Sequence, residues 1–133
     1  MDDFYRENIL DHYRKPRNKG RLENATHTHQ EHNPLCGDEI RIDLLVNSQD
    51  IIEDVRFEGH GCAISQASAS MLTEMVQGKS VEEAKQLSKE DILEALGIPI
   101  GPVRLKCALL SLKVLKAGIY GMPDWTDEDE DKW

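Results

Sequence analysis

The sequence predicts an α+β domain, in which a small antiparallel sheet packs against several α-helices. From Glu39 to Val46, apolar and polar residues alternate, as in a strand with one buried face. Residues 51–58 have a second strand pattern, and the turn-forming residues 47–50 separate the two segments, which predicts an antiparallel hairpin. Apolar residues before and after this hairpin recur at helical spacing. A chain of 133 residues is long enough to bury a core as one domain.

Five segments have helical patterns. Residues 2–14 form the first, which Pro16 ends, and the second runs from the glycine-rich turn at residues 59–62 to Gln77. Two shorter helices begin with capping-box sequences at residues 80–83 and 88–91. The last helix starts at Pro102 and ends near Ala117.

Residues 15–33 are polar and irregular, so we expect a mobile arm, although a strand around residues 24–30 stays open. Three of its side chains, His27, His29 and His32, could bind a metal, but histidines in a polar segment are more often solvated. We place His12, in the first helix, on the helix surface.

The charge distribution separates a body, residues 1–123, from an acidic tail, residues 124–133. The net charge is −9, and the tail contains six acidic residues and one lysine. Such a segment is too charged to pack, so we expect it to be disordered. No basic face remains for nucleic acid. The sequence also contains no segment long and apolar enough for a membrane span, and its acidic start is unlike a secretory signal, which predicts a cytoplasmic protein.

Three cysteines cannot all pair within one chain, and in a cytoplasmic protein they suggest metal or sulfur chemistry. Cys36 and Asp38 lie two residues apart in a turn that Pro34 and Gly37 exclude from helix, so their side chains can converge on one metal ion. The predicted hairpin places Cys62 at the same end of the sheet. Cys107, in the second turn of the last helix, is the remaining thiol.

Three thiolates and one carboxylate match a four-coordinate zinc site or an iron–sulfur cluster site. Ligands from distant segments, one of them a harder oxygen, suit a site that binds and releases its metal or cluster. Each cysteine alone is more often buried and inert than functional, and it is their combination that favours a site. His60 is a candidate to contact a ligand, and Lys106 a candidate to stabilise the thiolate of Cys107. A structural zinc domain is disfavoured because there is no CxxC pair, and a zinc hydrolase because no base stands near the cysteines.

Three motifs resemble the IscU/SufU family of iron–sulfur scaffold proteins (the NifU N-terminal domain). They are Asn33–Asp38, Gly59–Ser70 and Arg104–Ala108, and the match covers about residues 2–119. The resemblance implies an IscU/NifU-N-like α+β fold with about three strands. It also implies that Cys36, Asp38, Cys62 and Cys107 bind zinc or a transient [2Fe–2S] cluster.

The resemblance further implies a scaffold that receives persulfide sulfur from a PLP-dependent cysteine desulfurase and passes a cluster to apo-proteins. Cys36 and Cys107 are the persulfide acceptors to consider. An Hsp70 co-chaperone system stays open as a partner, because Ile100–Arg104 departs from the IscU chaperone motif, and an iron donor stays open as well. A zinc-dependent sulfurtransferase, and hence an enzyme, is the alternative: Lys106 is SufU-like, whereas the SufU insertion between the second and third cysteines is absent.

Overall fold

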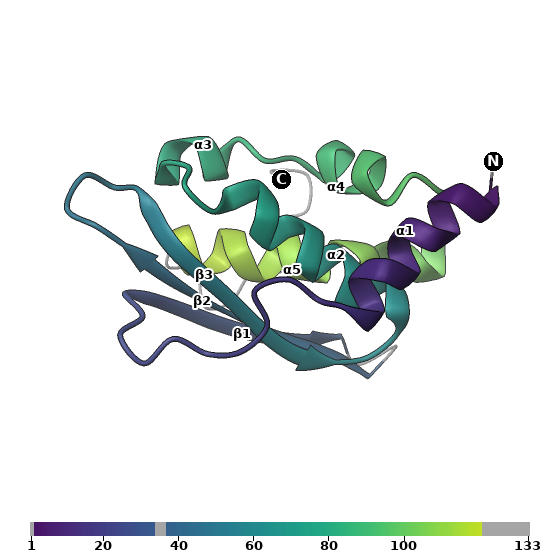
Figure 1. Cartoon of the computed structure of the whole chain (residues 1–133), viewed down its shortest axis with the longest axis horizontal. Coiled ribbons are helices and arrows are strands. Elements are labelled where there is room, and N and C mark those ends of the chain that lie inside the picture. The colour runs from purple at the N-terminus through teal and green to yellow at the C-terminus, as the bar shows by residue number, and fades with distance from the viewer. Residues whose placement is uncertain (1, 34–36, 121–133) are drawn as a thin grey trace.

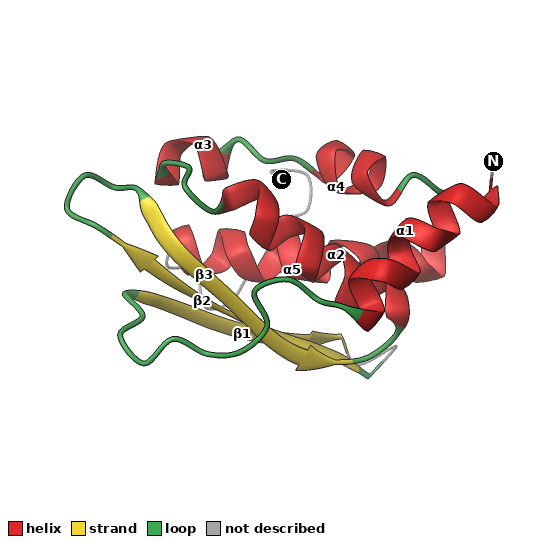
Figure 2. Ribbon diagram, in the orientation of Figure 1, coloured by secondary structure: helices red, strands yellow, loops and turns green. Residues whose placement is uncertain are grey.

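The computed structural model describes residues 2–33 and 37–120, which form one three-stranded sheet and five helices. Helices α2 and α5 pack against one face of the sheet, while α1, α3 and α4 lie beyond them (Figures 1 and 2). The predicted α+β class is confirmed. In chain order the elements are α1 (Asp2–Arg14), β1 (His27–Asn33), β2 (Asp38–Val46), β3 (Ile52–His60), α2 (Ala63–Val76), α3 (Val81–Lys85), α4 (Lys89–Leu96) and α5 (Pro102–Tyr120).

The predicted hairpin is β2 and β3, paired antiparallel in a sheet of order β1-β2-β3. The alternation of apolar residues in β2 sets its orientation: Ile40, Ile42 and Leu44 are buried against the helices. Glu39 pairs with His60 in the register, so the start of β2 and the end of β3 meet at one end of the sheet. This pairing brings together the two segments that contain Asp38 and Cys62.

The prediction of a mobile arm over residues 15–33 is wrong for its second half, which forms β1. Its sequence is polar throughout and has no apolar alternation that would indicate a strand. β1 forms because it pairs with β2 along its whole length and because α5 packs against it. His27 and His29 are half-buried rather than solvated, and His29 Nε2 lies 2.9 Å from Glu31 Oε1. Gly118 of α5 permits this close packing, because a Cβ there would lie 3.3 Å from the His29 Cβ.

The first half of that segment is also anchored. The backbone N–H of Gly20 donates to the carbonyl of Phe57 at 2.8 Å, and Phe57 N–H donates to the carbonyl of Asn18 at 2.9 Å. Asn18 has a positive φ of 58°, a conformation that asparagine tolerates better than most residues. The connection between α1 and β1 therefore lies along the outer edge of β3.

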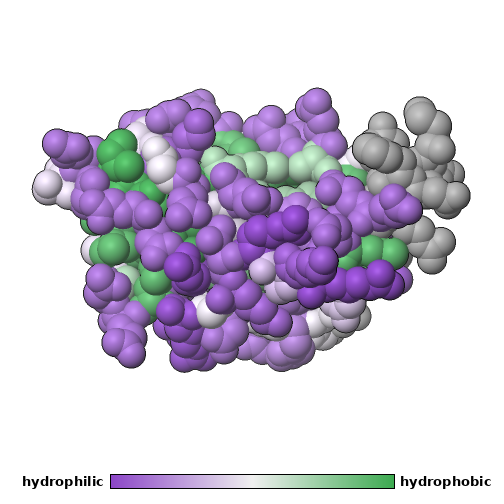
Figure 3. Space-filling view, in the orientation of Figure 1, coloured by the Kyte–Doolittle hydropathy of each residue, from purple (hydrophilic) through white to green (hydrophobic). Residues whose placement is uncertain are grey.

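Helix α2 lies at the centre of the molecule, and its burial is not limited to one apolar face. Every residue from 65 to 73 is buried, because α1, α4, α5 and β3 all contact this helix. Its buried serines are small enough to pack between helices, as where Ser68 Oγ lies 3.2 Å from Ser111 Oγ of α5. The surface in Figure 3, in contrast, is largely hydrophilic, with apolar residues in separate patches.

The two short helices begin as predicted. Ser80 and Glu83 form a capping box at the start of α3, and Ser88 and Asp91 form one at the start of α4. Gly97 ends α4 in the left-handed conformation, with φ of 71°. In the part of the chain that the structure describes, no helix combines the length and apolar character needed to cross a membrane.

Candidate metal centre

Asp38 is the first residue of β2, and its side chain is buried at 1% exposure. A buried carboxylate needs partners, because removing its charge from water is costly. Asp38 Oδ1 accepts a hydrogen bond from the backbone N–H of Cys62 at 2.9 Å, and Oδ2 lies 3.6 Å from Cys62 Sγ. The β2–β3 pairing thus creates direct contact between two of the predicted ligands.

Cys62 is the N-cap residue of α2, with extended backbone dihedrals of φ −71° and ψ 163°. Its side chain makes no capping hydrogen bond, and it is half-buried beside Asp38. The unpaired N–H groups and the dipole of the first helical turn favour negative charge at this position. An anionic set of metal ligands is therefore well placed here.

Cys107 reaches the same point from α5, where it is 1% exposed. One ligand atom each from Asp38, Cys62 and Cys107 lies within 4.8 Å of the other two. Bond lengths of about 2.0–2.3 Å to a tetrahedral zinc ion place its ligand atoms roughly 3.3–3.8 Å apart. Small side-chain rotations would suffice for all three to bind one metal ion.

The donor set fits a thiophilic metal. Two thiols and one carboxylate, largely shielded from water, match zinc or iron better than magnesium or calcium, which prefer oxygen ligands. Among the described residues, no other three His, Cys, Asp or Glu side chains come together in this way. The three histidines of β1 are not part of such a group.

Cys36, the fourth predicted ligand, lies outside the described residues. The next residue, Gly37, is described: its N–H donates to the carbonyl of Asn33 at 2.8 Å, and its φ is positive at 72°. Gly37 therefore has the turn conformation expected before β2. Covalent geometry alone keeps the Cα atoms of Cys36 and Asp38 within about 7 Å of each other. The assignment of Cys36 as a ligand stays a prediction.

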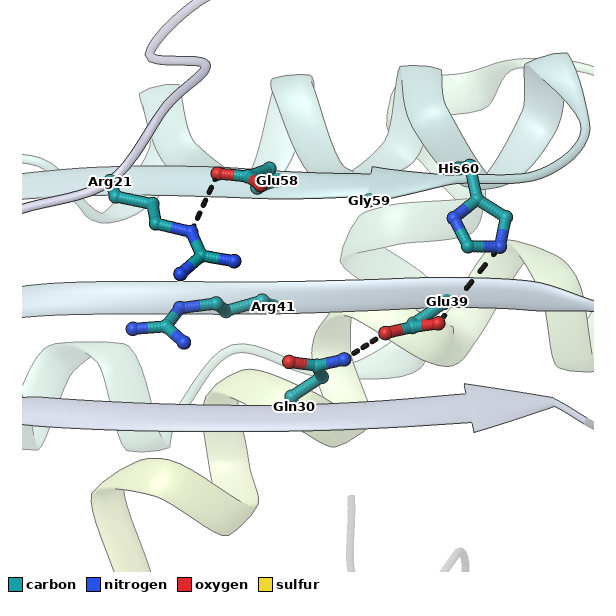
Figure 4. A pocket seen from close by; sticks show the side chains of 7 residues that line it. All are labelled: Arg21, Gln30, Glu39, Arg41, Glu58, Gly59 and His60. Atoms are coloured by element: carbon teal, nitrogen blue, oxygen red, sulfur yellow. Dashed lines mark hydrogen bonds and ion pairs between the residues drawn. The ribbon is translucent and has the colours of Figure 1, made fainter.

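His60 lies on the opposite face of the sheet from Asp38. Its side chain is 72% exposed, and its Nε2 is 3.9 Å from Glu39 Oε2 (Figure 4). Because side chains alternate along a strand, Glu39 and its partner His60 point outward when Asp38 points inward. They line a shallow polar pocket together with Arg21, Gln30, Arg41, Glu58 and the backbone of Gly59.

Lys106 precedes Cys107 on α5 and is half-buried. Consecutive residues on a helix are about 100° apart around the axis, so the two side chains leave the helix in different directions. Any support of the Cys107 thiolate by Lys106 would be electrostatic. That role also stays a prediction.

The fold and the site define a small α+β protein in which cysteine and aspartate side chains form a group that could hold a metal ion. The family model for the NifU-like N terminal domain matches residues 4–128. The chain belongs to this family, the IscU/SufU family of iron–sulfur cluster assembly scaffolds. The resemblance found in the three motifs is thereby confirmed.

Relatives from both branches of the family are similar to this chain. The zinc-dependent sulfurtransferase SufU of Bacillus subtilis is 42% identical over 136 residues, covering 90% of this chain and 91% of the relative. The iron–sulfur cluster assembly scaffold protein IscU of Escherichia coli K12 is 40% identical over 118 residues, covering 86% and 91%. Identity alone does not separate the two branches.

Solved structures show the same fold. A candidate scaffold protein for the SUF system from Fervidobacterium islandicum superimposes with a TM-score of 0.73 at 32% identity, covering 85% of this chain and 94% of that one. A second crystal structure, of a hypothetical protein, gives a TM-score of 0.77 at 34% identity and covers 90% and 99%.

Proposed function

We propose that this protein assembles a [2Fe–2S] cluster from iron and persulfide sulfur and transfers it to apo-proteins. The observation that supports the proposal most directly is the convergence of Asp38, Cys62 and Cys107 from three separate elements. Thiolates bind iron and accept sulfur, and the carboxylate is a weaker ligand for cluster iron than a fourth thiolate. This combination of ligands suits a protein that binds a cluster temporarily and then transfers it.

In the absence of a cluster, the same residues fit zinc. Asp38, Cys62 and Cys107, with Cys36, would supply four ligands, and zinc bound there would order the thiols and keep them deprotonated. The hydrogen bond from Cys62 N–H to Asp38 already aligns two of these residues. Metal content therefore reports on the ligand set independently of cluster assembly.

Sulfur enters the proposal by thiol exchange with a PLP-dependent cysteine desulfurase. A cysteine thiolate of this chain attacks the terminal sulfur of the desulfurase persulfide, the S–S bond breaks, and the desulfurase cysteine leaves as a thiolate. The acceptors to consider are Cys36 and Cys107. Burial of Cys107 at 1% exposure favours Cys36 as the first acceptor.

A zinc-dependent sulfurtransferase is the second candidate function. Lys106 before Cys107 and the 42% identity to the Bacillus subtilis SufU protein support it. In that case the protein passes persulfide sulfur to another scaffold and builds no cluster itself. Both candidates share the desulfurase as a partner and a cytoplasmic setting; apo iron–sulfur proteins are partners only of the first.

Anaerobic reconstitution distinguishes the two functions. The protein is incubated with iron(II), cysteine, a cysteine desulfurase and dithiothreitol as the reductant that converts persulfide sulfur to sulfide. We expect the visible absorption of a [2Fe–2S] cluster that stays with the protein through gel filtration. Cys62→Ser should lose it, and Ser111→Ala, a buried α5 variant one helical turn from Cys107 but outside the ligand set, should keep it. Persulfide on the wild-type protein without any cluster would favour the sulfurtransferase.

A further inference from the structure

The absence of a side chain at Gly61 creates the space that the Asp38 carboxylate occupies. A Cβ atom added at Gly61 would lie 2.1 Å from Asp38 Oδ1 and 2.6 Å from Asp38 Cγ. Real Cβ atoms do not approach other atoms so closely, and the Asp38 side chain is buried with little room to move. Any residue other than glycine at position 61 must therefore displace this carboxylate.

The position of the carboxylate also decides which of its oxygens is available. Oδ1 lies against Gly61 and accepts the Cys62 N–H at 2.9 Å, while Oδ2 is the oxygen beside Cys62 Sγ, at 3.6 Å. A carboxylate held in this way would offer a metal ion one oxygen, Oδ2, because the other is already engaged. The backbone of residues 61–62 thus controls how Asp38 can bind.

We propose that Gly61 is a positioning residue for the metal centre. Its missing side chain lets Asp38 lie against the chain beside Cys62, with Oδ1 held by the Cys62 N–H and Oδ2 turned to the metal as a single ligand atom. The inference rests on the proposed function only in requiring that Asp38 bind the metal.

A purely conformational role for Gly61 is the alternative. Its φ of +143° is one that residues with side chains rarely adopt, so a substitution would strain the backbone even without Asp38. Gly20 provides the matched control: its φ is +133°, and nothing lies within 4 Å of an added Cβ. Gly59 is unsuitable, because a Cβ there would lie 2.0 Å from the backbone oxygen of Glu39 and would disturb the sheet itself.

The test compares Gly61→Ala, Gly20→Ala, Asp38→Gly and the double variant Gly61→Ala/Asp38→Gly in the full chain. Zinc affinity is measured by competition with a chelator, and the ligand set by the absorption spectrum of the cobalt(II) form. We expect Gly61→Ala to weaken zinc binding by about 10-fold or more and to change the cobalt spectrum, as expected for a misplaced ligand. Gly20→Ala should stay within about twofold of the wild type.

The double variant separates steric positioning from backbone strain. Asp38→Gly removes the atoms that an added Cβ would meet, so Gly61→Ala should have little further effect on zinc affinity in that background. An equal loss in both backgrounds, or a wild-type cobalt spectrum in Gly61→Ala, would overturn the proposal. Gly61→Ala by itself could fail to fold. In that case, a double variant that folds supports the positioning role of Gly61. A double variant that does not fold, while Asp38→Gly folds, overturns that role.

Failure of the ligand set gives a different result. If Asp38→Gly itself has wild-type zinc affinity and a wild-type cobalt spectrum, Asp38 is not a ligand, and the positioning role falls together with that part of the proposed function. If Asp38→Gly weakens binding and Gly61→Ala does not, only the role of Gly61 is wrong.

Discussion

His12 Nδ1 of α1 lies 2.8 Å from Ser70 Oγ of α2, in the buried contact between the two helices. Ser70 Oγ also accepts the backbone N–H of Arg17 at 2.9 Å, which leaves the hydroxyl proton for donation to Nδ1. The imidazole is then neutral with its proton on Nε2, which faces Glu74 Oε1 at 3.6 Å. The expectation that His12 lies on the helix surface is therefore wrong.

This contact predicts a loss of stability at acidic pH. Burial lowers the pKa of His12, and the nearby Arg17 lowers it further, although Glu74 and Asp11 act in the opposite direction. A histidine pKa that is lower in the folded state favours the neutral form, so its contribution to stability is fully present above the unfolded pKa of about 6.5 and is lost as pH falls through the folded pKa.

Thermal melts at pH 7.5 and pH 5.5 measure this effect. We expect the melting temperature of the wild type to fall by a few degrees more than that of His12→Gln, whose amide can still accept from Ser70 but does not titrate in this range. Carboxylates titrate equally in both proteins, and His32→Gln, on the exposed side of β1, serves as a control. Parallel pH dependences in wild type and His12→Gln would exclude this role for His12.

Metal content is the direct test of the ligand set. We expect about one zinc per chain in the purified wild type, because three thiolates and one carboxylate complete a tetrahedron. Cys36→Ser, Cys62→Ser and Cys107→Ser should each lose most of it, while Ser111→Ala should retain it. Elemental analysis of the four variants provides the comparison, and unchanged zinc in all three cysteine variants would refute the site.

Sulfur acceptance should occur first at Cys36. Cys107 is buried in α5, so a desulfurase could reach it only after local opening, and Cys62 is half-buried beside Asp38. Mass spectrometry of peptides after brief incubation with a desulfurase and cysteine should show about 32 Da, the mass of one sulfur atom, added at Cys36 before Cys107. Added sulfur at Cys62 alone is the result that would contradict us.

Asp38 should matter more for cluster transfer than for sulfur acceptance. A carboxylate is the weaker ligand for cluster iron, and it can leave to open a coordination position for an acceptor thiol. Asp38→Ala should still accept persulfide, and a cluster formed on it should pass to an apo-ferredoxin more slowly than the wild-type cluster. Circular dichroism follows the transfer.

A thermal melt of the same variant tests the other explanation. If Asp38 only fastens the start of β2 to Cys62, then Asp38→Ala loses stability but transfers at the normal rate. A normal rate would remove Asp38 from the transfer step.

The acidic tail should be dispensable for folding. Residues 124–133 lie outside the described residues, and the expectation rests on the sequence, which has six acidic residues there and no apolar periodicity. Deleting the tail should leave the melting temperature nearly unchanged. A large loss of stability would mean that Trp125 or Trp133 packs against the body.

The elements with strong local signals were predicted correctly. The alternation in β2 and the capping boxes at Ser80 and Ser88 are decided by interactions within a few residues, which the sequence displays directly. The same holds for the turn at Gly37. Strand β1 has no such signal: its residues are polar, and its order comes from β2 and α5, which are distant in the sequence.

The sequence by itself determined the candidate residues for a metal centre: Asp38 and Cys62 stand out by residue type and by the glycine-containing turns beside them, and Cys107 stands out as a thiol. Only the tertiary structure decided how they meet. The pairing of Glu39 with His60 fixes Asp38 next to Cys62, and the packing of α5 on the sheet and on α2 adds Cys107. Register and helix packing are set by contacts across the whole fold, so the space that Gly61 leaves for the carboxylate could not be predicted from the order of residues.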